Sequence, residues 1–192
     1  ISPTTAALVD PPGRRSTAAE SGELVDALLT GAVTGPLAIW EVSNRLRLPR
    51  RGPYVVAAVR ADTDGPSDDL ELRVRSAGFA AAWRTTRDDH TGLVGLTRRA
   101  GDDRRLVAAL RTRSASLSIG VSSAFACLDQ AAESAVLARA AALAAARRGQ
   151  VVCAFDDDPL AVAVVAAAGV GERAARTVLA GLDGTADDVR EG

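Results

Sequence analysis

The fold is decided by the stretch Tyr54-Val55-Val56-Ala57-Ala58-Val59-Arg60. It is apolar up to its last residue and contains several valines, which favour extended backbone because they branch at Cβ. A continuous apolar run of this kind is typical of a central strand covered on both faces. The polar loop Asp62-Thr63-Asp64-Gly65-Pro66 ends it. We therefore expect a sheet built around residues 54–60.

The remaining patterns predict helices and strands that alternate around this strand. Apolar residues at helical spacing predict helices, and short apolar runs bounded by turn residues predict strands. Towards the C-terminus we expect a helix at Asp68–Ser76, strands at Ala80–Thr86 and Leu93–Thr97 joined by the hairpin turn Arg87–Gly92, a helix at Asp102–Arg113, a strand at Leu117–Val121, a long alanine-rich helix at Leu128–Arg148 and a strand at Val151–Phe155. The order β-α-β-β-α-β predicts an α+β fold of the ferredoxin-like class, extended by the long helix and one more strand. Such a fold is a mixed antiparallel sheet, with helices that we expect on one face.

Composition suggests how the chain is organised. Its first residues are rich in Pro, Ser, Thr and Ala without apolar periodicity, which is typical of a flexible segment. Helical spacing then returns from Ser21 to Gly31 and again from Pro36 to Leu46. We expect a flexible leader at residues 1–20, a helical segment at 21–52, the sheet domain at 53–158 and a helical linker at 159–192.

The charge balance argues against a protein that coats nucleic acid. The chain has 192 residues, 23 basic and 24 acidic groups and a net charge of −1, and every basic residue is arginine. Binding by counterion release needs clustered, uncompensated cations. No apolar stretch reaches the roughly 18 residues that a membrane span needs, and the N-terminus lacks the basic start and apolar run of a signal peptide. We expect a soluble, cytoplasmic protein without a membrane partner and, because Met is absent, a fragment of a longer chain.

Two pairs of aspartates are candidate metal ligands. Asp62 and Asp64 follow the first strand, and Asp88 and Asp89 lie in the hairpin turn, so a ferredoxin-like sheet brings all four to one end. Four carboxylates suit Mg²⁺, which prefers oxygen ligands and commonly bridges to phosphates. The alternative, which we favour, is that these are ordinary acidic loops and that the chain uses no metal or cofactor. The run Asp156-Asp157-Asp158 is better explained by helix capping.

Three other polar features admit a chemical interpretation and a plainer one. His90, the only histidine, lies in the hairpin turn, where it is either a general base oriented by an aspartate or, as we expect, a solvated turn residue. Ser122 resembles the serine of a nucleophile elbow, but that arrangement needs a histidine later in the chain, so we exclude acyl transfer. Cys127 and Cys153 are too few for a disulfide framework and too isolated for a zinc site, and we expect buried free thiols.

A glycine-rich segment near the C-terminus is a candidate DNA contact. It reads Gly169-Val170-Gly171-Glu172-Arg173-Ala174-Ala175 and resembles the hairpin of a helix-hairpin-helix element, whose backbone amides bind a phosphate. The alternative, which we favour, is a plain helix-breaking turn.

A family resemblance rests on the order of several motifs. The strand Leu117-Ser118-Ile119-Gly120-Val121-Ser122 resembles the Ser-Ile-Gly-Val strand of GGDEF domains, whose core has the same order of elements. The path from Glu23–Gly31 through Leu46–Pro49 to Pro53–Val56 looks like that of the PucR/CdaR-type bacterial transcriptional regulators. In that family a helical segment leads into a GGDEF-like domain. The resemblance covers roughly residues 21–182.

The resemblance implies a regulatory protein and not a nucleotide cyclase. A diguanylate cyclase carries paired glycines, acidic residues and a following Phe at the hairpin, whereas this hairpin reads Arg87-Asp88-Asp89-His90-Thr91-Gly92. Family members end in a helix-turn-helix domain that reads DNA, and this chain stops at Gly192, where that domain would begin. We expect a non-catalytic GGDEF-like domain that forms a homodimer, responds to an unknown small-molecule effector and reaches DNA only through the missing C-terminal domain.

Two surfaces are candidates for the dimer interface. One is the small-residue surface of the Leu128–Arg148 helix, and the other is formed by the helices at residues 21–46 with an exposed Trp40. The alternative function is a Mg²⁺-dependent nucleotide sensor or degenerate cyclase that uses the four aspartates.

Overall fold

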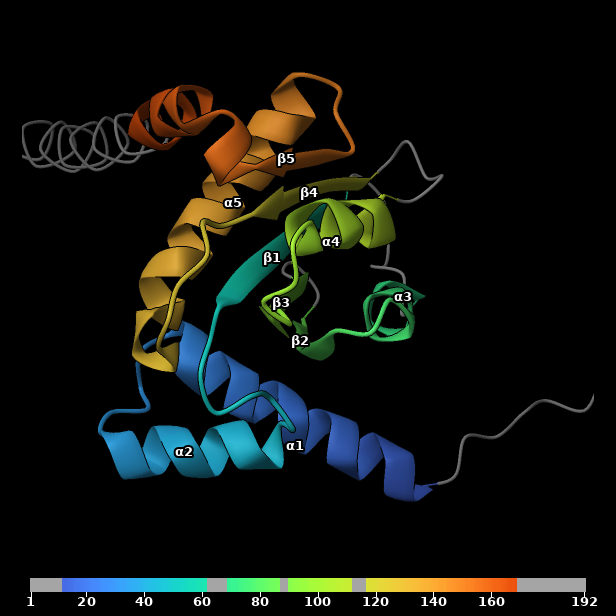
Figure 1. The fold of residues 1–192 in the computed structure, drawn as a ribbon, viewed down its shortest axis with the longest axis vertical. Coiled ribbons are helices and arrows are strands. Elements are labelled where there is room, and N and C mark those ends of the chain that lie inside the picture. The colour runs from blue at the N-terminus through green and yellow to red at the C-terminus, as the bar shows by residue number, and fades with distance from the viewer. Residues whose placement is uncertain (1–11, 62–68, 87–89, 112–116, 169–192) are drawn as a thin grey trace, which may run out of the picture.

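The computed structural model describes residues 12–61, 69–86, 90–111 and 117–168 (Figure 1). Its elements are α1 (Pro12–Leu29), α2 (Pro36–Arg45), β1 (Tyr54–Ala61), α3 (Asp69–Ser76), β2 (Ala80–Thr85), β3 (His90–Gly95), α4 (Asp102–Leu110), β4 (Leu117–Val121), the 3-10 turn η1 (Leu128–Gln130), α5 (Ala131–Arg147), β5 (Val152–Ala154) and the 3-10 turn η2 (Phe155–Asp157). Residues 159–168 are also helical.

The strands form one five-stranded sheet in the order β2-β3-β1-β4-β5. β1 lies at the centre and pairs antiparallel with both β3 and β4. β2 pairs antiparallel with β3 at one edge, and β5 pairs parallel with β4 at the other. The first four strands have the order of a ferredoxin-like sheet, so the predicted α+β class is confirmed.

Helices cover both faces of the sheet, and not one face as the sequence predicted (Figure 1). Alternate residues of β1 belong to two separate cores. The core towards α3 and α4 contains Val55, Ala57 and Val59, and the core towards α1, α2 and α5 contains Tyr54, Val56 and Ala58. Successive side chains of a strand point to opposite faces, so an uninterrupted apolar strand needs a covering layer on each side.

The alanine face of α5 packs directly on the sheet. Its buried residues include Ala131, Ala135, Ala138 and Ala142, which share a core with β1. At Gly120 of β4 the approach is so close that a Cβ atom would lie 2.0 Å from the Ala138 carbonyl oxygen. The sheet therefore covers the small-residue surface of this helix, and that surface is not available as the interface that the sequence suggested.

Helix α1 begins at Pro12, before the start at Ser21 that the sequence predicted. Proline is favoured in the first turn of a helix because its missing N–H would have no partner there, so Pro12 starts this helix and does not break it. The C-terminal half of α1 buries Val25, Leu28 and Leu29 in the core shared with α5. The rest of the predicted leader, residues 1–11, lies outside the described residues.

A smaller third core holds the helix at residues 159–168. Val162 and Val165 pack against Ala141 and Ala145 of α5 and against Cys153 of β5. The rest of the predicted helical linker, residues 169–192, lies outside the described residues. Among the helices of the described ranges, none is long and apolar enough to cross a lipid bilayer.

Candidate functional site

The aspartates predicted as metal ligands, Asp62, Asp64, Asp88 and Asp89, lie outside the described residues, as does the candidate DNA hairpin Gly169–Ala175. The described residues that flank the aspartates are neighbours, because Val59 of β1 pairs with His90 of β3. In the part of the chain that the structure describes, no group of three or more His, Cys, Asp or Glu side chains is arranged to hold a metal ion.

His90 is the first residue of β3 and is buried, so the prediction of a solvated turn residue is wrong. The strand begins earlier than the predicted Leu93, which places the histidine inside the sheet, opposite Thr85 of β2. Its ring stacks on Trp83, with the ring centroids 4.7 Å apart. Its Nδ1 atom lies 2.7 Å from the Thr85 hydroxyl.

Trp83 and Gly92 form a close cross-strand pair beside this histidine. They are directly opposite in the register of β2 and β3. A Cβ atom on Gly92 would lie 2.4 Å from a carbon of the Trp83 ring, so the indole occupies the space that a side chain at residue 92 would fill. Trp83 is only 6% exposed. The described base of the hairpin is therefore a packed aromatic cluster and not an open cavity.

Ser122 has a structural role. It is buried, its Oγ accepts a hydrogen bond from the Val56 N–H at 2.9 Å, and its hydroxyl donates to the Ser123 carbonyl at 2.9 Å. The bond from Val56 extends the contact between the end of β4 and β1, and the Ser122 N–H also donates to the Val56 carbonyl. This serine continues the sheet past the last residue of β4.

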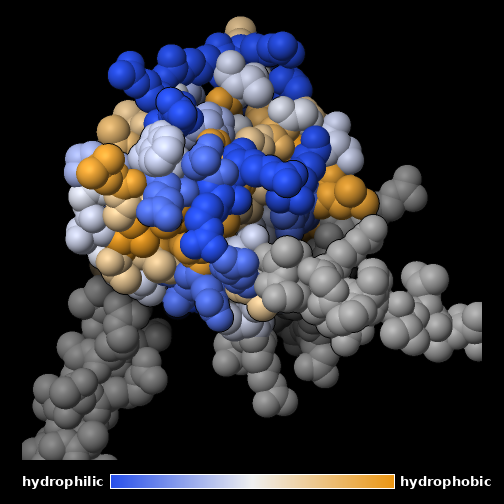
Figure 2. Space-filling model, turned by 90° about the horizontal axis from the view of Figure 1, so that it is seen from below, coloured by the Kyte–Doolittle hydropathy of each residue, from blue (hydrophilic) through white to orange (hydrophobic). Residues whose placement is uncertain are grey.

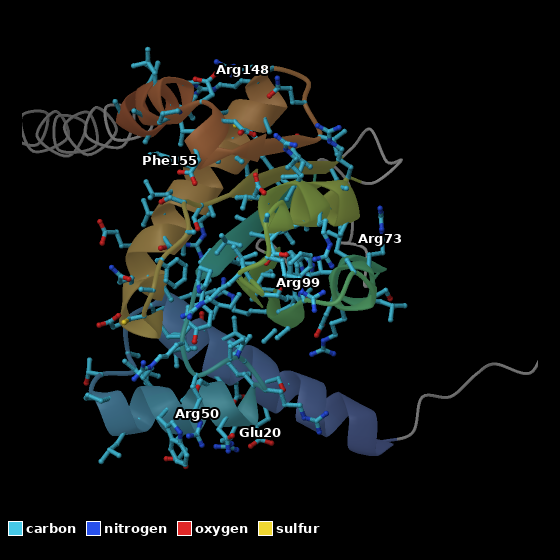
Figure 3. The ribbon with its side chains drawn as sticks, in the orientation of Figure 1. Glu20, Arg50, Arg73, Arg99, Arg148 and Phe155 are labelled. Atoms are coloured by element: carbon cyan, nitrogen blue, oxygen red, sulfur yellow. The ribbon has the colours of Figure 1, made fainter. Side chains whose placement is uncertain are left out.

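Asp158 caps the helix at residues 159–168, as the sequence predicted for this acidic run. Its Oδ1 accepts a hydrogen bond from the Ala161 N–H at 3.1 Å. Its other oxygen accepts a hydrogen bond from Arg148, which lies just beyond the end of α5 (Figure 3). The Arg148 guanidinium and the Ala161 N–H together lower the pKa of the Asp158 carboxyl. The pair ties the end of α5 to the start of the next helix.

The two cysteines differ in their surroundings. Cys153 is buried, as predicted, and burial raises the pKa of its thiol. Cys127 is exposed, so the prediction is wrong for this residue. The neighbouring Leu128 enters the core at this position, which leaves Cys127 at the surface.

Asp102, which was not among the residues expected to matter, organises the loop before α4. Its buried carboxylate accepts hydrogen bonds from the Thr97 N–H at 2.7 Å and the Arg99 N–H at 3.2 Å, and it pairs with Arg105. Burial would raise the pKa of Asp102, but the hydrogen bonds from Thr97 and Arg99 and the Arg105 charge outweigh it and lower the pKa. Asp102 lies in the first turn of α4, where acidic residues are favoured, and this was visible in the sequence. Its carboxylate bonds to the loop before the helix and does not cap the helix, whose N-cap is Gly101.

The sequence pattern that defines the GGDEF-like domain matches residues 30–144 of the chain. This range covers more than half of the 192 residues. The chain belongs to the GGDEF-like domain family. No match was found among the curated proteins. The match spans α2, the strands β1 to β4 and most of α5, so this GGDEF-like domain includes the ferredoxin-like core. The GGDEF-like prediction is confirmed, whereas the PucR/CdaR assignment stays a prediction.

Proposed function

We propose that this GGDEF-like domain is the regulatory part of a cytoplasmic bacterial transcriptional regulator of the PucR/CdaR type. In this proposal the domain is non-catalytic, associates as a homodimer and relays the binding of a small-molecule effector to a helix-turn-helix domain elsewhere in the full protein. Helix-turn-helix proteins commonly bind paired half-sites as dimers. A domain that sets the geometry of the dimer therefore also sets the affinity for DNA.

The observation that carries the proposal is the core shared by the N-terminal helices and the GGDEF-like sheet. Leu28 of α1, Val42 of α2, Tyr54 of β1 and Ala135 of α5 belong to one buried cluster. Protein interiors are close-packed, so a displacement of α1 or α2 shifts the sheet and α5 with it. This mechanical continuity is what a relay between an effector site and a distant domain requires.

The packed base of the hairpin supports a non-catalytic domain. A cyclase hairpin needs glycines that let the backbone approach a nucleotide, as the resemblance implies. Here the Trp83 ring already occupies the space over Gly92, and His90 stacks on the same ring. A bound nucleotide would have to displace these side chains from their packing.

The outer face of α2 is the surface that we propose for self-association. Leu37 is 83% exposed and Trp40 is 45% exposed, and residues three apart lie on the same face of a helix. The guanidinium of Arg50 lies 5.4 Å from the centre of the Trp40 ring. Seen from the side of α1 and α2, the molecule shows a band of hydrophilic side chains with separate apolar patches beside it (Figure 2). Aromatic residues and arginine are enriched in protein interfaces.

Sedimentation of the full regulator, with and without its DNA, tests this proposal. The double change Leu37→Ala and Trp40→Ala should weaken the dimer by about tenfold or more, because hot-spot truncations commonly cost more than 1 kcal/mol. Leu72→Ala is the matched control, since Leu72 is an equally apolar, 63% exposed residue on α3. A regulator that is monomeric with and without DNA, and whose regulation survives deletion of residues 21–158, would overturn the proposal.

The alternative function, a Mg²⁺-dependent nucleotide sensor, is favoured by one observation. The pairing of Val59 with His90 brings the described ends of the two aspartate-bearing segments together. Calorimetry with GTP, ATP and cyclic dinucleotides in the presence of Mg²⁺ distinguishes the two functions. Tight, metal-dependent binding that Asp62→Ala and Asp88→Ala abolish would replace the first proposal by the second.

A further inference from the structure

Strand β2 has a free edge whose orientation follows from the register. The Leu96 N–H donates to the Pro53 carbonyl. In an antiparallel pair every second residue faces the same neighbour, so the main-chain groups of Val94, Gly92 and His90 also point towards β1. Their partners in β2 are Ala81, Trp83 and Thr85, whose main-chain groups therefore point away from the sheet. The carbonyl of Ala81 confirms this direction, because it accepts a hydrogen bond from the Arg75 side chain at 2.9 Å. Within the described residues, the outward main-chain groups of Trp83 and Thr85 have no partner.

A groove of about 1070 Å³ runs along this edge. Its floor is formed by residues 82–86, and its walls come from α1, from the end of α2 and from α3. Helix α1 covers one face of β2, where Ala82 joins the core of Val25, and α3 covers the other, where Trp83 joins the core of Leu70. Pockets for small molecules commonly have about 300–1,000 Å³, so this groove lies at the upper end of that range.

The charges that line the groove are largely paired with one another. Arg84 pairs with Asp26, Arg45 with Glu20 and Arg75 with Glu71. Figure 3 shows Glu20 on the α1 side, at the lower part of the molecule. Arg47 and Glu23 are the lining charges that form no ion pair within the described residues, and Arg47 is the one cation among them. It is exposed and so available to a ligand.

The backbone conformation at Arg47 is one that disfavours an arginine. The Arg47 N–H donates to the Asn44 carbonyl and the Leu48 N–H to the Ser43 carbonyl, which is the hydrogen-bond pattern of a Schellman helix end. The residue in this position takes a left-handed conformation, and Arg47 has a φ of 55°. Glycine is strongly favoured there because a Cβ atom costs energy in that conformation. An arginine at this position therefore places a cation beside the groove at some cost to the helix end.

We propose that this groove binds an extended segment of a partner protein, which adds to β2 as a further strand and directs a carboxylate to Arg47. Addition of a strand to a sheet edge uses main-chain hydrogen bonds for affinity, and here Trp83 and Thr85 provide them. The length of β2, 6 residues, corresponds to about 20 Å of extended chain. Helices α1 and α3 flank this edge on its two sides, and the occupant that we propose between them is a single extended chain.

Peptides selected from a phage-displayed library of random nonapeptides on the folded chain provide the probe. We expect the selected peptides to carry an Asp or Glu and, on binding, to slow hydrogen exchange at the Trp83 and Thr85 amides. Thr85→Pro removes the outward N–H and should weaken binding about tenfold or more, since a lost hydrogen bond with an unsatisfied partner costs about 1–3 kcal/mol. Thr85→Val is the matched control, because it also removes the hydroxyl but keeps the N–H, and it should bind as the unchanged chain does.

Arg47→Ala supplies a second, independent variant at an exposed position. This change should weaken the binding of acidic peptides about tenfold and leave the binding of their Asn or Gln analogues unchanged. Arg104→Ala, at an exposed arginine of α4 that does not line the groove, should change neither. If Thr85→Pro does not fold, Arg47→Ala and the amide exchange decide the outcome.

Several results would overturn the proposal. These are a library that yields no peptide tighter than about 1 mM, peptides that leave exchange at Trp83 and Thr85 unchanged, and equal binding by the Arg47→Ala chain. Self-association that Thr85→Pro abolishes would also overturn it, because the occupant would then be a second copy.

Discussion

Gly120 of β4 lies against Ala138 of α5 so closely that a Cβ atom would approach the Ala138 carbonyl oxygen to 2.0 Å and the Ala142 backbone nitrogen to 2.1 Å. No side chain reaches such distances from backbone atoms, so any larger residue at position 120 must push the helix away from the sheet. This contact gives a physical reason for the glycine in the Ser-Ile-Gly-Val strand.

Gly120→Ala should therefore destabilise the domain by about 1–3 kcal/mol or more, the usual cost of overpacking a core. Urea denaturation followed by circular dichroism measures it. Gly22→Ala is the control, because Gly22 lies inside α1 and a Cβ atom added there would have no other atom within 4 Å, so alanine should stabilise the helix by about 0.5–1 kcal/mol. Equal stabilities for the two variants would contradict the packing of α5 on β4.

Gly92→Ala should disturb the aromatic cluster at the base of the hairpin. The added methyl group meets the Trp83 ring at 2.4 Å, so the indole must move, at a cost of about 1–3 kcal/mol. Its fluorescence, measured in a Trp40→Phe background, should shift to longer wavelength as the ring becomes hydrated. The double variant with Trp83→Phe relieves part of the clash, and its destabilisation should be smaller than the sum of the two single effects. Additive effects would show that the ring does not lie over Gly92.

The charge of Asp102 should make stability depend on pH. Its pKa is lowered in the folded chain, so it stabilises the fold above the unfolded-state pKa of about 3.9, and this contribution is lost as the pH falls through the lower folded-state pKa. Asp102→Asn should cost about 1–2 kcal/mol at pH 7. The difference from the unchanged chain should narrow at acid pH, as denaturation at several pH values would show. Asp103→Asn, at the exposed neighbouring position, should cost little at any pH. A constant difference across the pH range would contradict the role of the Asp102 charge.

The two thiols should react at very different rates with a thiol-specific reagent. Cys127 is exposed, whereas Cys153 is buried and its thiol pKa is raised. The thiolate is the reactive form, so burial and a raised pKa both slow Cys153. Mass spectrometry of the native chain should find one modification, and Cys127→Ser should abolish it. In denaturant both cysteines should react, and rapid native modification of the Cys127→Ser chain would contradict the third core.

The strands were predictable because their signals are local. The apolar run at residues 54–60 and the turn residues around it predict β1 directly, and the order of elements then restricts the sheet to few topologies. The burial of β1 on both faces was present in the same pattern, although the expected helix layer was placed on one side only. The start of α1 within the expected leader was missed because proline can both break a helix and begin one.

The site was less predictable because its contacts are made between distant parts of the chain. His90 lies among polar turn residues, and only its pairing with Thr85 and Val59 places it inside the sheet. At the turn η1 the Leu128 side chain lies in the core and the Cys127 thiol at the surface, which periodicity does not reveal. The groove beside β2 combines α1, α2, α3 and β2, so no single stretch of sequence indicates it.

The limits of the family match do not coincide with the cooperative folding unit. A protein trimmed to residues 30–144 would lose all of α1, including Val25, Leu28 and Leu29, which cover the apolar side of β2 and β3. It would also lose β5 and the third core. Exposed apolar surface and an unpaired β4 edge would make such a piece prone to aggregation. A soluble domain for experiment should therefore retain all of α1 and extend to residue 168.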